Sequence, residues 1–180
     1  MRIKRDIFSI VIKFYEWFFI RFKPLTVHTE GIMIDAVWEE IKKEVLKGKI
    51  FKWYVMTPEN NDYYKSFFNV NFSKLKLSNI MKERYFWMIK HNQKLELHIH
   101  LSLIMENMPY VQQEKIFKDA INWMKKELKI TPKEFVPGWW AYNKDTLKIC
   151  KKYNLKMIHE KDYDYTHDYY PLLDFIRTKK

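Results

Sequence analysis

Short β-type runs alternate with stretches of helical periodicity from Pro24 onward, and this alternation constrains the fold more than any other feature of the chain. The expected strands are residues 25–29, 51–56, 95–101, 135–136 and 156–159. Between them, apolar side chains recur at the three- and four-residue spacing of amphipathic helices. Strands that alternate with helices favour a parallel sheet in one α/β domain. We therefore expect residues 24–180 to form a single (β/α) barrel, either incomplete or distorted.

Residues 1–23 precede this domain and are expected to form an amphipathic helix. Most of its surface is apolar, and Arg5, Ser9, Lys13 and Glu16 make a narrow polar stripe. Lys13 and Glu16 interrupt the apolar run, so it falls short of the ~20 apolar residues of a membrane span, and no secretory cleavage site follows it. Two interpretations stay open: a helix packed across the domain, or a peripheral membrane anchor helped by flanking basic residues. The expected location is cytoplasmic, with contact at the inner membrane face in the second case.

Composition limits the chemistry that the chain can support. It has three glycines and one cysteine among 180 residues, which excludes glycine-rich phosphate loops, disulfide frameworks and cysteine-based zinc clusters. Any metal site must therefore use His, Asp or Glu. The net charge of +11 and the 18% aromatic content raise the alternative of a basic nucleic-acid-binding module. The basic residues are scattered and no known nucleic-acid-binding signature occurs, so no specific nucleic acid is expected as a partner.

Two expected strands end in paired polar residues. Because alternate strand residues share a face, His28 lies on the same side as Glu30, and His98 on the same side as His100. Both pairs fall at carboxyl ends of strands, where α/β folds gather active sites. Two imidazoles and a carboxylate are a common donor set for catalytic Zn²⁺, with Ni, Fe or Co as alternatives. His28 would then act as general base. The competing interpretation is that these are hydrogen-bonded polar residues lining a barrel.

Four stretches together resemble the polysaccharide deacetylases, the NodB-homology carbohydrate esterases. They are residues 25–31 (LTVHTEG), 91–101 (HNQKLELHIHL), 135–143 (FVPGWWAYN) and 143–153. The resemblance implies a distorted (β/α) barrel and metal-assisted hydrolysis of an N-acetyl or O-acetyl group on a sugar. It places Glu30 at the metal-binding acid, and His98 and His100 at the histidine motif. The substrate-binding residues that it implies, or that lie next to its groove motif, are Trp139, Trp140, Tyr142 and Asn143.

This chain departs from the family pattern at two positions. The usual catalytic aspartate is replaced by His28, and the arginine that orients it by Val136. The two changes are physically coherent, because a neutral imidazole needs no guanidinium beside it. One interpretation is an altered deacetylase with His28 as base or extra ligand. The other is a catalytically inactive, sugar-binding or membrane-associated relative. His159 and His167 are the candidates for the family's late histidine acid.

Overall fold

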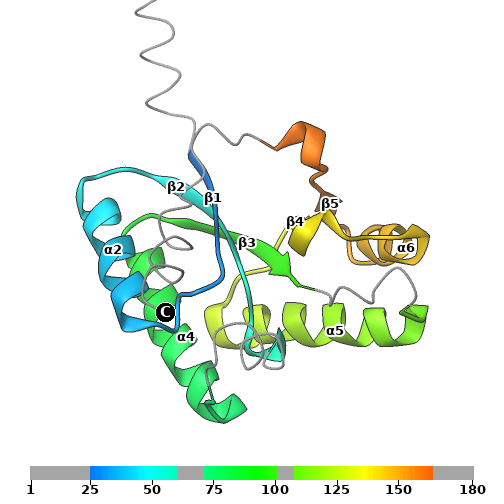
Figure 1. Ribbon diagram of the computed structural model, residues 1–180, viewed down its shortest axis with the longest axis horizontal. Coiled ribbons are helices and arrows are strands. Elements are labelled where there is room, and N and C mark those ends of the chain that lie inside the picture. Colours follow the sequence, from blue (N-terminus) through cyan, green and yellow to red (C-terminus); the bar gives the residue numbers. More distant parts are fainter. Residues whose placement is uncertain (1–24, 61–70, 101–107, 164–180) are drawn as a thin grey trace, which may run out of the picture.

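The structure, a computed structural model, describes residues 25–60, 71–100 and 108–163 (Figure 1). Its strands are β1 (Leu25–Thr29), β2 (Phe51–Val55), β3 (Lys94–Ile99), β4 (Glu134–Pro137) and β5 (Lys156–Met157). Its α-helices are α2 (Asp35–Leu46), α4 (Lys74–Lys90), α5 (Tyr110–Trp123) and α6 (Lys144–Lys152), and α5 continues into a π-helical turn, Met124–Leu128. Short 3-10 turns occupy Pro58–Asn60, Gly138–Trp140 and Glu160–Asp162. The expected helix over residues 1–23 lies outside the described residues.

The five strands form one parallel sheet in the order β1-β2-β3-β4-β5. Parallel strands in sequential order need crossover connections, and because such crossovers are right-handed in nearly all proteins, the connecting helices are expected on one face of the sheet. Figure 1 shows α2 at the left of the sheet, α4 at the lower left, α5 below it and α6 beside its far end. Within the described ranges β1 and β5 do not pair with each other, so the barrel is open. The expectation of an incomplete α/β barrel is confirmed.

The last strand is shorter than expected, Lys156–Met157 instead of residues 156–159. Ile158 still donates its N–H to the carbonyl oxygen of Phe135, at 2.9 Å. The next ladder bond would need an N–H from Pro137, which a proline lacks. The pairing therefore stops at the proline, and the chain turns into Glu160–Asp162.

The two faces of the sheet bury different groups. The face covered by helices holds the main core, in which Val27, Trp53, Leu97 and Phe135 pack against apolar side chains of the helices. The opposite face carries a smaller cluster: Tyr54, Val136, Ile158 and Tyr163, with Trp140 packed against it. His28 and His98 alternate with the core residues and therefore lie on this second face. Among the described residues, no helix is long and apolar enough to cross a membrane.

Helix α6 begins after Asn143, a residue type that favours the N-cap position of helices. The side chain of Asn143 accepts hydrogen bonds from the N–H groups of Asp145 and Thr146, and the Thr146 hydroxyl accepts one from the Asn143 N–H. This reciprocal capping box fixes where the helix starts. Gln113, fully buried on α5, accepts a hydrogen bond from the Thr146 hydroxyl at 2.7 Å. The chain that follows the Gly138–Trp140 turn is thereby tied to the body of the domain.

Candidate metal centre

The register of the sheet brings the two polar pairs to one level. Thr29 of β1 pairs with Val55 of β2, which in turn pairs with Leu97 of β3. The residues that follow on the outer two strands, Glu30 and His98, therefore emerge side by side across the end of β2. His100 follows two residues after His98 on the same face. The structure thus brings Glu30, His98 and His100 together at the carboxyl edge of the sheet.

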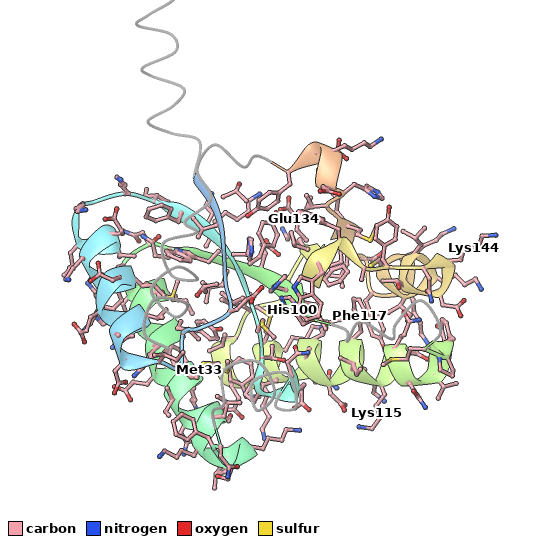
Figure 2. The ribbon with its side chains drawn as sticks, viewed as in Figure 1. Met33, His100, Lys115, Phe117, Glu134 and Lys144 are labelled. Atoms are coloured by element: carbon pink, nitrogen blue, oxygen red, sulfur yellow. The ribbon has the colours of Figure 1, made fainter. Side chains whose placement is uncertain are left out.

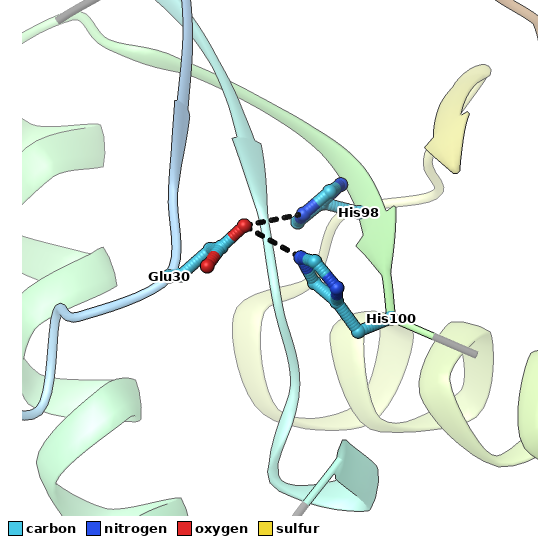
Figure 3. Close-up of side chains that lie close together, drawn as sticks. All are labelled: Glu30, His98 and His100. Atoms are coloured by element: carbon cyan, nitrogen blue, oxygen red, sulfur yellow. Dashed lines mark hydrogen bonds and ion pairs between the residues drawn. The ribbon is translucent and has the colours of Figure 1, made fainter. Parts of the chain in front are cut away.

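Glu30, His98 and His100 form a compact cluster of potential metal ligands (Figure 3). Glu30 Oε1 lies 2.5 Å from His100 Nε2 and 3.6 Å from His98 Nε2. One ligand atom from each residue lies within 4.8 Å of the others. Donor atoms around a tetrahedral Zn²⁺ stand roughly 3–3.5 Å apart, given metal–ligand bonds of about 2.0–2.1 Å. The cluster thus has the size that a small divalent ion needs.

The orientation of His98 also suits a metal ligand. Its Nδ1 lies 2.9 Å from the carbonyl oxygen of Val136, so Nδ1 carries the proton and donates it. Nε2, on the Glu30 side, is then the unprotonated nitrogen, and among the described residues this buried atom has no hydrogen-bond partner. A backbone carbonyl that fixes the far nitrogen is the usual outer support of a metal-binding histidine. The donor set and the unsatisfied nitrogen both fit a divalent ion.

The charges in the cluster also suit the binding of a divalent ion. Burial raises the pKa of the Glu30 carboxyl, but its hydrogen bond with His100 and its charge interactions with His100 and His98 outweigh that effect and hold the pKa well below its ordinary value. Burial lowers the pKa of His98 to about 4, against an opposing effect of Glu30. At neutral pH the centre therefore holds an ionised carboxylate and, at His98, a neutral imidazole. These are the protonation states that metal binding requires.

His100 is held by contacts from two other segments. Asn60 donates a hydrogen bond from its side-chain amide to the carbonyl oxygen of His100, at 2.9 Å. Gly138 packs so closely on the imidazole that a Cβ there would lie 2.5 Å from Cγ and 2.7 Å from Cε1. The ring of Trp139 meets the same imidazole edge-on, with ring centroids 4.6 Å apart. Figure 2 shows His100 near the middle of the molecule, whereas Lys115 and Lys144 point outward.

His28 stands beside the cluster without belonging to it. Its ring centroid is 5.4 Å from that of His98, and its Nδ1 lies 3.2 Å from the hydroxyl oxygen of Tyr163. The donor group within 4.8 Å comprises Glu30, His98 and His100 alone among the described residues. His28 therefore lies beside the candidate ligand cluster and is not one of its members.

The four predicted substrate-binding residues differ in their surroundings, and Trp139 contacts the cluster through His100. Trp139 is 42% exposed, and both it and Trp140 adopt left-handed backbone angles, φ of 50° and 56°. Such conformations are costly for bulky side chains and gather at functional sites. Trp140 packs edge-on against Tyr163, while the exposed Tyr142 hydroxyl lies 3.2 Å from His159 Nδ1. Asn143 caps α6, and His167 lies outside the described residues.

No family model and no curated protein matches the sequence, whereas solved structures share its fold. A family 4 carbohydrate esterase from Streptomyces lividans, in complex with acetate, has a TM-score of 0.53 at 11% identity over 75% of this chain and 60% of its own. A CE4 family pseudoenzyme from Bacillus anthracis has a TM-score of 0.54 at 12% identity over 76% and 42%. The peptidoglycan deacetylase PdaC from Bacillus subtilis has a TM-score of 0.51 at 13% identity over 75% and 56%.

The chain has the fold of the family 4 carbohydrate esterases. The resemblance seen in the four sequence stretches is thereby confirmed for the fold. The chain spans 42% to 60% of the length of these three structures.

Sequence reasoning missed three residues that support the centre of this esterase fold. Tyr163 contacts His28, Asn60 binds the backbone at His100, and Gly138 makes room for the His100 ring. Pro-Gly before two tryptophans marks a turn, but it does not indicate which side chain the glycine would meet. Tyr163 and Asn60 lie outside every periodic segment, so no sequence signal points to them.

Proposed function

We propose that this protein is a metal-dependent hydrolase that removes an acetyl group from an N-acetylated or O-acetylated sugar. The observation that carries the proposal is the cluster of the half-buried Glu30 with the buried His98 and His100, at the carboxyl edge of a sheet with the esterase fold. We assign the metal as a divalent ion, Zn²⁺ first and Ni, Fe or Co as alternatives. The substrate class follows from the neighbours of this fold, which are carbohydrate esterases and a peptidoglycan deacetylase.

Each group of site residues would have a separate role in this reaction. Glu30, His98 and His100 would hold the ion, which when bound supplies Lewis-acid chemistry by lowering the pKa of a water molecule and polarising the acetyl carbonyl. His28 would take the proton of the attacking water, since its ring stands beside that of His98. The exposed face of Trp139 would pack against a sugar ring, with Trp140, Tyr142 and Asn143 shaping or orienting the rest of the groove.

A second candidate function is a catalytically inactive sugar-binding or membrane-associated protein of the same fold. Two observations favour it: His28 and Val136 stand where the family resemblance expects an aspartate and an arginine. One structural neighbour is described as a pseudoenzyme, and a mutant of that neighbour as having restored enzymatic activity. Loss of activity within this fold therefore has a precedent.

The first experiment is metal analysis of untagged protein together with acetate release from acetylated chito-oligosaccharides and acetylated xylan. We expect one divalent ion per chain, lost in His98→Ala and kept in the matched control His91→Ala, whose ring stacks on Trp87 away from the centre. Absence of bound metal in the wild-type chain would exclude the metal centre. Metal binding without acetate release from either substrate would favour the second candidate.

The location and membrane contact of the chain are separate proposals. We infer a cytoplasmic protein, with residues 1–23 available for peripheral contact. Residues 1–24 fused to a reporter should partition with vesicles that contain anionic lipid if they form an anchor. A fusion that stays in the aqueous phase at low salt would favour the packed-helix interpretation.

A further inference from the structure

The contact between His28 and Tyr163 joins two segments that lie 135 residues apart in the sequence. The hydroxyl oxygen of Tyr163 is 3.2 Å from His28 Nδ1, and the two rings meet edge-on with centroids 6.0 Å apart. Tyr163 follows the Glu160–Asp162 turn after β5 and is 7% exposed. A tyrosine from the far edge of the sheet thus reaches the proposed base on β1.

Tyr163 is fixed by apolar packing on the second face of the sheet. It belongs to the cluster that contains Tyr54, Val136 and Ile158, and its ring lies edge-on to that of Trp140, with centroids 5.3 Å apart. The Tyr163 ring therefore has little room to rotate, and this packing holds its hydroxyl next to His28. Val136 presents only an apolar surface here, so this β4 position offers His28 no polar side chain.

The direction of this hydrogen bond decides the tautomer of His28. Either Nδ1–H donates to the Tyr163 oxygen, or the Tyr163 hydroxyl donates to an unprotonated Nδ1. If Nδ1 carries the proton and donates it to Tyr163, Nε2 is the unprotonated nitrogen of a neutral ring. A general base needs a nitrogen in that state.

We propose that Tyr163 is a positioning residue that holds His28 as its Nδ1–H tautomer and leaves Nε2 as the basic nitrogen. The orienting role that the family resemblance gives to an arginine at position 136 is transferred to a neutral hydroxyl from another segment. The inference about the reaction rests on the proposed function, whereas the tautomer of His28 can be measured without metal or substrate.

The test is a long-range ¹H–¹⁵N correlation spectrum of ¹⁵N-labelled, metal-free protein at about pH 8.5, where an ordinary histidine is neutral. A His28→Gln sample assigns the His28 signals. We expect the Nδ1–H pattern in the wild-type protein and a shift to the Nε2–H pattern in Tyr163→Phe. The phenylalanine keeps the ring in its apolar cluster. Tyr153→Phe is the control, because Tyr153 closes the end of α6 and its hydroxyl faces Glu114.

Activity gives a second readout. In Tyr163→Phe, kcat for acetate release should fall about 10- to 100-fold, while KM and metal content stay unchanged. The expected loss is smaller than the roughly 10²–10⁴-fold that general-base catalysis contributes, because His28 itself is still present. An Nε2–H pattern in the wild-type protein, or an unchanged pattern in Tyr163→Phe, would overturn the proposal even if activity fell. The expected tautomers without acetate release from the wild-type protein would reject the proposed function and keep the role of Tyr163.

Discussion

Replacing Gly138 with alanine tests the metal centre at the point where the structure leaves least room. The added Cβ would lie 2.5 Å from Cγ and 2.7 Å from Cε1 of His100, and closer still to Nδ1. Non-bonded carbon atoms prefer about 3.5–4.0 Å, so the imidazole or the Gly138–Trp140 turn must move by about 1 Å. Gly138 is not in the left-handed region, so the penalty comes from the steric overlap and not from the backbone.

The size of the effect follows from this displacement. Overpacking of this kind costs about 1–3 kcal/mol of the free energy of unfolding. Functional groups tolerate errors of about 0.5 Å, so a shift of about 1 Å takes His100 Nε2 out of register with Glu30 and His98. We expect Zn²⁺ affinity to fall by about 10- to 100-fold, as when the outer support of a metal ligand is removed.

The assay is Zn²⁺ affinity by competition with a chromophoric chelator, combined with thermal unfolding of the metal-free protein. Gly48→Ala is the matched control: Gly48 has φ of +79° and nothing within 4 Å of an added Cβ. Its strain of about 1–2 kcal/mol lies far from the centre, so stability should fall while Zn²⁺ affinity stays unchanged. Folded Gly138→Ala protein with wild-type affinity would refute the proposed packing of His100.

Three further predictions concern stability and reactivity. Gln113→Ala should lower the free energy of unfolding by about 1–3 kcal/mol in urea, because it removes the nearer acceptor of the buried Thr146 hydroxyl and the donor to the Met108 carbonyl oxygen. Gln112→Ala, at an exposed position, should have almost no effect. The pKa of His98 is about 4 in the folded chain and 6.5 in the unfolded chain, so the unfolded chain binds more protons between these two pH values. The free energy of unfolding of the metal-free protein should therefore fall by about 3 kcal/mol as the pH is lowered through this range. A His98→Gln variant with an equally steep decline would contradict this assignment. Burial raises the pKa of the Cys150 thiol to about 12, so it should resist thiol reagents at about pH 8 until the protein unfolds; rapid labelling of folded protein would show that the site is open.

Much of the fold could be predicted because the strands and helices are indicated by patterns among neighbouring residues. The period of two in residues 95–101 and the helical period between the strands each depend on neighbouring residues, and the structure places β3 and the four main helices where these patterns indicate. The same local pattern indicates that His98 and His100 share one face of the strand and lie at its end. The length of β5 could not be predicted from its own residues, because it ends where the partner strand reaches Pro137.

The sequence by itself determined the order of strands and helices, the cap at Asn143 and the three metal-ligand candidates, since each follows from spacing along the chain. Only the tertiary structure decided how those candidates are supported. The sheet register sets Glu30 level with His98, and Gly138 and Tyr163 reach His100 and His28 from distant segments. These contacts depend on how packed elements fit together in space, and the spacing of apolar residues along the sequence contains no information about that fit.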